Sequence, residues 1–73
     1  MAVATDFKVG AEVAFDYTTV DGEDRQVGSL QVERTSQSRA GDFLVTGIRD
    51  HDENTQRVYR VDRIRNLKVL ADA

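Results

Sequence analysis

The sequence has 73 residues, a formal net charge of −3, and neither cysteine nor proline. A chain of this length forms one domain and buries only about 60% of its unfolded surface. The lack of cysteine excludes a disulfide framework and a thiolate metal site, and the acidic balance excludes a bulk electrostatic grip on nucleic acid.

The opening residues, Met1 to Asp6, carry neither a basic segment nor a long apolar run. We therefore expect no signal peptide, and we treat residues 1–11 as an extension of a single domain whose core runs from about residue 12 to residue 70. No stretch approaches the roughly 20 apolar residues that a membrane span needs. A soluble, cytoplasmic protein without membrane contact is expected.

The first strand is expected at Glu12–Thr18, where Val13, Phe15 and Tyr17 share one side. This alternation is typical of a half-buried strand. Asp21-Gly22 follows between two alternating runs, and glycine tolerates the positive φ that hairpin turns require. The pattern predicts a β-hairpin.

The second strand is expected at Arg25–Thr35, but Val27 is out of step with Leu30 and Val32. One extra residue at Gly28-Ser29 would restore the register. We therefore predict a β-bulge or sharp bend at that point. A strand bent at a glycine is typical of small closed barrels.

The rest of the chain predicts three more strands, two polar turns and one short helical turn. In order these are a loop at Ser36–Gly41, strands at Asp42–Arg49 and Thr55–Val61 around a turn at Asp50–Asn54, a helical turn at Asp62–Arg65, and a strand at Asn66–Leu70. Five short strands without an amphipathic helix predict a small all-β barrel. Closure would remove the exposed sheet edges.

The predicted core consists of the apolar residues in phase on these strands. They are Val13, Phe15, Leu30, Val32, Leu44, Ile48, Tyr59, Val61, Ile64 and Leu67.

Five basic residues fall between Arg57 and Lys68, opposed there only by Asp62. Arg60 and Arg63 could form a phosphate fork, because guanidinium groups donate bidentate hydrogen bonds and stay charged. Simple alternation places Arg57 on the other face of its strand from Arg60. The alternative is a solvated face on which Arg63 pairs with Asp62 or Asp16 and ties the turn to the barrel.

Three single residues admit both a structural and a functional interpretation. Tyr17 is in phase with the core, although it could stack a base or ligand ring. Phe43 is expected to pack inside the barrel, with a place on a ligand surface as the alternative. His51 lies in an acidic turn that lacks the spacing of a calcium loop, so we expect a solvated turn and no metal.

The segment Arg57-Val58-Tyr59-Arg60-Val61-Asp62-Arg63-Ile64 resembles the end of a WYL domain. That family ends its barrel with an arginine, a spacer, an aromatic residue and then Arg-aliphatic-Asp-Arg-Ile. Val13 to Tyr17, Asp21-Gly22 and Arg25-Gln26-Val27 resemble the family's first strand, first turn and second-strand start. Asp42-Phe43-Leu44 stands where the name-giving Trp-Tyr-Leu belongs. The resemblance covers roughly Glu12 to Leu70.

The resemblance implies an SH3-like or Sm-like barrel that senses a ligand in transcription regulation. It implies binding of single-stranded nucleic acid or a nucleotide through basic and aromatic side chains, which here are Tyr17, Arg25, Arg57, Arg60 and Arg63. WYL domains usually accompany a helix-turn-helix or winged-helix unit, which is not recognisable in these residues. A partner chain could supply it.

Two functional hypotheses follow. The first is a regulatory module that binds an anionic ligand and needs no cofactor. The second is a structural or protein-interaction barrel, either an adaptor or a homo-oligomer, without nucleic-acid binding. We expect no catalysis, because no nucleophile–base pair is recognisable and the acids fall mostly on turns.

Overall fold

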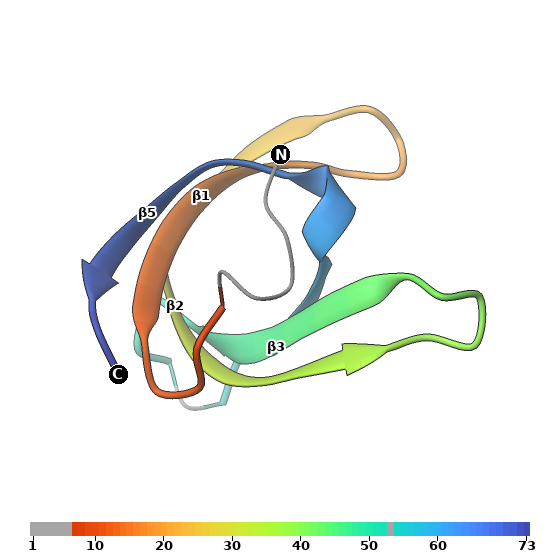
Figure 1. The fold of residues 1–73 in the computed structure, drawn as a ribbon. Helices are drawn as coiled ribbons and strands as arrows, with labels where there is room; N and C mark the ends of the chain where they lie inside the picture. Colours follow the sequence, from red (N-terminus) through yellow and green to blue (C-terminus); the bar gives the residue numbers. More distant parts are fainter. Residues whose placement is uncertain (1–6, 53) are drawn as a thin grey trace.

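The computed structural model describes residues 7–52 and 54–73, which form one curved antiparallel sheet (Figure 1). Its strands are β1 (Glu12–Thr18), β2 (Asp24–Gln37), β3 (Phe43–Arg49), β4 (Gln56–Arg60) and β5 (Ile64–Ala71). A three-residue 3-10 helix, η2 (Val61–Arg63), links the last two. The predicted all-β class with five strands and one short helical turn is confirmed. Residues 1–6 and Glu53, including the opening segment for which we expect no signal peptide, lie outside the described residues.

The sheet order is β4-β3-β2-β1-β5, so β4 and β5 are its two edges. The predicted closure is therefore wrong, because no ladder of hydrogen bonds joins these two strands within the described residues. The chain instead passes from one edge to the other through η2, while the curvature of the sheet wraps it around the core (Figure 1). No helix in the described part of the chain is long and apolar enough to cross a membrane.

The strands differ from their predicted bounds mainly around the helical turn. The turn occupies Val61–Arg63 instead of Asp62–Arg65, and β5 starts at Ile64 instead of Asn66. β2 extends two residues beyond Thr35, and with β3 it forms a hairpin that projects from the sheet (Figure 1). The hairpin turn at Gly22 is confirmed, and this glycine has a φ of 86°.

The predicted bulge at Gly28-Ser29 is confirmed by the pairing of β1 with β2. Val13 lies opposite Leu30 and Phe15 opposite Val27, so two steps along β1 match three along β2. The extra residue turns Val27 inward with Leu30 and bends β2 at the same place. A second irregularity follows Val32 in the pairing with β3. β2 therefore pairs with β1 through its first half and with β3 through its second.

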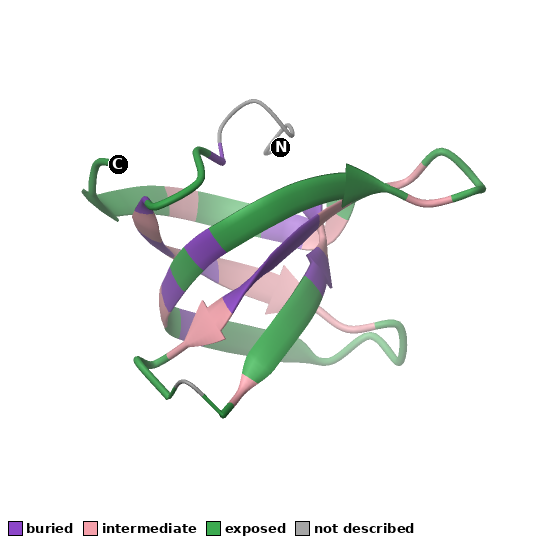
Figure 2. Cartoon of the chain, turned by 90° about the horizontal axis from the view of Figure 1, so that it is seen from below, coloured by how far each residue is buried: buried purple, intermediate pink, exposed green. Residues whose placement is uncertain are grey.

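The core lies inside the curve of the sheet, where the strands cross (Figure 2). Seven predicted core residues are buried: Val13, Phe15, Leu30, Val32, Tyr59, Val61 and Ile64. Phe7, Ala11, Val27 and Val45 are buried as well. Leu67 is only partly buried against the core.

Leu44 and Ile48 were assigned to the core wrongly, because both are only half-buried. Apolar residues occupy both faces of β3, so periodicity alone does not select the inner one. The cross-strand pairing does: Val45 lies opposite Tyr59 and is fully buried. Gly47, two residues on, shares that inner face.

Gly47 lies where β3 crosses closest to β2. A Cβ at this position would stand 2.9 Å from the Leu30 side chain and would collide with the Gln31 carbonyl oxygen. Gly28, in contrast, has no heavy atom closer than 3.9 Å to such a Cβ. Gly47 therefore permits the close crossing of two strands, whereas Gly28 permits the bend of β2.

We expect Gly47→Ala to lower the free energy of unfolding by about 1–3 kcal/mol, because the backbone of β2 must shift. Gly28→Ala is the matched control and should change it by less than about 1 kcal/mol. Urea denaturation of both variants measures the difference. Equal losses in the two would show that the crossing at Gly47 is not tightly packed.

Candidate anion-binding site

Tyr17 and Arg25 face each other at the end of the first hairpin. They are directly opposite in the pairing of β1 with β2. Arg25 also shares the inner face of β2 with the buried Val27, two residues on. Its side chain therefore stands over the open end of the core.

Arg49 and Arg57 reach the same end from the hairpin of β3 and β4. Arg57 lies opposite Gly47 and shares a face of β4 with the buried Tyr59. Arg49 ends β3 and begins a turn in which Asp50 and His51 have φ values of 54° and 60°. The Asp52 N–H donates to the Arg49 carbonyl oxygen at 3.1 Å, which closes a tight turn directly after β3.

These side chains surround a hollow of about 300 Å³, which we call the arginine mouth. Its lining residues come from three parts of the chain: Tyr17, Thr19, Arg25, Val27, Arg49, Arg57, Val58 and Tyr59. The floor is apolar, since Val27 and Tyr59 are buried. Among the described residues of this lining, every charged one is an arginine.

The three arginines are only lightly neutralised. Arg25 pairs with Glu23 at 2.6 Å, and Arg49 Nε lies 3.3 Å from Asp50 Oδ2. Both acids are well exposed, and exposed pairs of this kind are weak. The Nη2 of Arg49 also donates to the Gln26 carbonyl oxygen at 3.4 Å, whereas Arg57 forms no ion pair with any residue in the described ranges. Arg57 therefore offers unused donors to an anion at the arginine mouth.

Arg60 is occupied elsewhere. One of its terminal nitrogens lies 3.1 Å from Asp42 Oδ1 and 2.9 Å from Asp62 Oδ2, bridging the start of β3 to η2. Its backbone N–H donates to the Tyr17 hydroxyl at 3.1 Å. Two carboxylates around one guanidinium leave little positive potential for a phosphate at this position.

Arg63 is also used by the fold. Its Nη1 donates to the Thr19 carbonyl at 3.2 Å and ties η2 to the first hairpin. The expected tie is thus present, but the expected carboxylate partners are wrong. Asp62 pairs with Arg60, and Asp16 accepts from the Asn66 amide. The structure brings Tyr17, Arg25 and Arg57 together in the arginine mouth and holds Arg60 and Arg63 in other contacts.

Of the two aromatic residues that admit both a core and a ligand-binding position, Tyr17 and Phe43, only Tyr17 packs against the core. The Tyr17 ring packs edge-on against Tyr59 with centroids 4.9 Å apart, which fits its expected core position, yet it also lines the arginine mouth. Phe43 is 50% exposed, so the expected burial is wrong. It sits at the start of β3, on the projecting hairpin beyond the reach of the core.

Arg49 is the site residue that the sequence analysis missed. Its strand pattern carries a usable signal, since Arg49 is in phase with Val45 and Gly47 on the inner face. That signal depends on knowing which face of β3 points inward.

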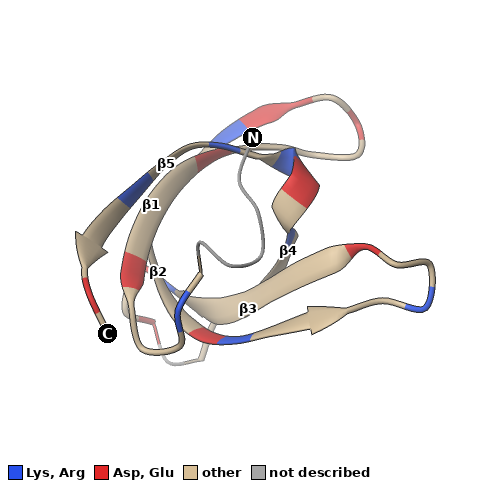
Figure 3. Ribbon diagram, viewed as in Figure 1, with Lys and Arg blue, Asp and Glu red and all other residues tan. Residues whose placement is uncertain are grey.

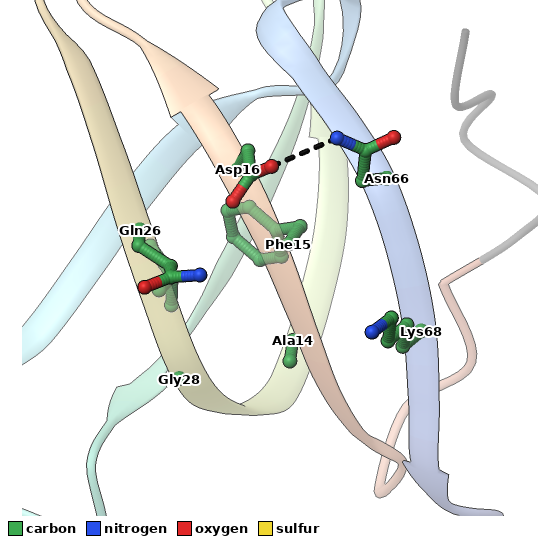
Figure 4. Close-up of a pocket in the computed structure, with 8 residues that line it drawn as sticks. Ala14, Phe15, Asp16, Gln26, Gly28, Asn66 and Lys68 are labelled. Carbon is green, nitrogen blue, oxygen red and sulfur yellow. Dashed lines mark hydrogen bonds between the residues drawn. The ribbon is translucent and has the colours of Figure 1, made fainter.

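A second hollow, of about 410 Å³, lies on the outer face of β1 between β2 and β5 (Figure 4). The hollow exists because Ala14 and Gly28 have little or no side chain. It is lined by polar and charged side chains, those of Asp16, Gln26, Asn66 and Lys68. The Asp16 carboxylate accepts a hydrogen bond from Asn66 at 2.8 Å and opposes the charge of Lys68. An anion in this hollow would face a carboxylate, so the arginine mouth is the better anion site.

His51 contacts Glu12 rather than a metal-ligand set. Its Nε2 lies 2.8 Å from Glu12 Oε2, which also accepts from the Ser29 hydroxyl at 2.6 Å. Within residues 7–52 and 54–73, no group of three His, Cys, Asp or Glu side chains is placed to hold a metal ion. These contacts hold the turn after Arg49 against the first hairpin.

Comparison with family models, curated proteins and solved structures found no match to this chain. The resemblance to WYL domains therefore rests on the residues quoted above and stays a prediction.

The turn between β3 and β4 also predicts a pH effect. Hydrogen bonds from the Thr55 hydroxyl and from the Asn54 backbone N–H hold the pKa of Asp52 below its ordinary value. A depressed carboxyl pKa stabilises the fold above the unfolded-state value, and the contribution is lost as the pH falls through the folded-state value. We expect Thr55→Val to raise the pKa of Asp52, as measured by NMR titration of the carboxyl carbons.

Thr35→Val, on an exposed position of β2, serves as the control and should leave the pKa of Asp52 unchanged. An unaltered Asp52 titration in Thr55→Val would show that the backbone N–H of Asn54 alone sets the shift.

Proposed function

We propose that this domain is a ligand-sensing module that binds an anionic ligand, such as single-stranded nucleic acid or a nucleotide, in the arginine mouth. The observation that carries the proposal is that three arginines, from β2, β3 and β4, line one hollow with no carboxylate among its described lining residues. Planar guanidinium groups match phosphate and carboxylate oxygens in bidentate pairs. The WYL resemblance supports the same class of ligand through Tyr17, Arg25 and Arg57.

The charge distribution supports local rather than extended contact. Acidic and basic residues are interspersed over the ribbon (Figure 3), and the whole chain carries a net charge of −3. Contacts with single strands contribute about −0.7 per neutralised phosphate to the slope of log K against log salt. Three arginine contacts would give a slope of about −2.

A second candidate function is assembly with another protein or with a second copy of this chain. It is favoured by the open sheet, because β5 pairs only with β1 among the described strands. Val69 and Leu70 on this edge strand are each about half exposed. An unpaired strand edge with apolar side chains can accept another strand.

We expect the Arg25→Ala, Arg57→Ala double variant to weaken binding of a fluorescein-labelled oligothymidylate by about tenfold or more, since a hydrogen bond to a charged group is worth about 1.5–3 kcal/mol. Fluorescence anisotropy at low and moderate salt measures both the affinity and the salt slope. Arg39→Ala is the matched control, because it removes an exposed arginine from the loop between β2 and β3. Equal losses in both variants would contradict the proposed site.

Self-assembly predicts that the molar mass in solution rises with concentration. Size-exclusion chromatography with light scattering on the unmodified chain and on Leu70→Lys measures this. Assembly through β5 should be lost in Leu70→Lys, because a charge then faces the apolar contact. A constant monomer mass over the concentration range would reject this candidate.

A further inference from the structure

Building on the proposed function, we infer that the arginine mouth takes a compact polyphosphate group, a di- or triphosphate, rather than the backbone of a nucleic-acid strand.

The three arginines of the arginine mouth line a single hollow. Arg25, Arg49 and Arg57 lie on three different strands and line one hollow of about 300 Å³. Proteins that hold single strands place their positive charges along a groove that tracks successive phosphates. A hollow at the lower end of the size range for small-molecule sites instead suits one cluster of phosphate oxygens.

The two aromatic rings at the arginine mouth are held by contacts within the fold. The Tyr59 ring is only 8% exposed and is covered edge-on by Phe15 and Tyr17. Tyr17 is held by the same ring contact and by the hydrogen bond that its hydroxyl accepts from Arg60. Stacking of bases on aromatic rings is a principal source of affinity for single strands. Recognition in the arginine mouth therefore falls to the charged groups.

Carboxylates flank the site in the turn before β2 and in the turn after β3. Glu23 is paired with Arg25, and Asp50 is in contact with Arg49. Both acids are at least 60% exposed, so a ligand displaces weak pairs when it binds. A di- or triphosphate brings several negative charges into the hollow. A nucleic-acid strand that leaves the hollow would instead carry its next phosphates past these two carboxylates, which repel them. Affinity should therefore rise from phosphate to diphosphate to triphosphate.

Arg57 supplies the free donors that such a ligand would engage. It has no carboxylate within ion-pair distance among the described residues, whereas Arg49 contacts the Asp50 carboxylate and the Gln26 carbonyl oxygen. An anion held by Arg57 would recruit Arg49 by displacing these weak, long contacts.

The experiment is isothermal titration calorimetry of the complete chain with inorganic phosphate, diphosphate and triphosphate, with AMP and ATP, and with oligothymidylates of increasing length. We expect triphosphate to bind at least tenfold more tightly than phosphate, and ATP to bind within a few-fold of triphosphate. Arg57→Ala should lose this binding and Arg39→Ala should keep it, with two-dimensional NMR spectra confirming that both variants are folded.

The outcomes separate the inference from the proposal beneath it. Tight ATP binding without triphosphate binding would show that the nucleoside supplies the contact, and would overturn the inference. Oligothymidylate binding that grows with length, is lost in Arg57→Ala and is not displaced by triphosphate would overturn the inference but support the proposed function. Absence of binding by every anion would overturn both.

Discussion

The bend of β2 is the constraint on which the rest of the structure depends. Residues Asp24–Gln31 pair with β1 and residues Leu30–Gln37 pair with β3, so the two halves of one strand build two hairpins that overlap only at Leu30 and Gln31. The bulge at Gly28-Ser29 and the close crossing at Gly47 make this possible. Because both hairpins share the strand, their inner faces turn toward one another and enclose the core.

The arginine mouth is a consequence of that geometry. The inner faces of β2 and β4 are apolar beside the core and become basic toward the hollow: Val27 is followed on its face by Arg25, and Tyr59 by Arg57. The charged groups stay in solvent at the open end, while their strands are fixed by the core beneath. A floor held in place by the core suits the capture of an anion, because the backbone need not rearrange.

The arginines that the fold uses for itself are as informative as those in the arginine mouth. Arg60 bridges Asp42 and Asp62, and Arg63 holds the Thr19 carbonyl, so both fasten η2 between the edges of a sheet that does not close. In this protein, η2 together with Arg60 and Arg63 connects the two edge strands that no ladder of hydrogen bonds joins in the described residues. The best match to the WYL pattern, Arg57 to Ile64, therefore mixes one residue of the candidate site with residues that maintain the fold.

The sequence by itself determined the strand content, the hairpin at Gly22 and the bulge at Gly28-Ser29, because periodicity and turn chemistry act between neighbours in the chain. It also placed Arg57 and Arg60 on opposite faces of one strand. Only the tertiary structure decided which residues of β3 are buried, that the sheet stays open, and that Arg25, Arg49 and Arg57 line one hollow. These features depend on pairing between distant strands, and β3 carries apolar residues on both faces, so local pattern could not select among the alternatives.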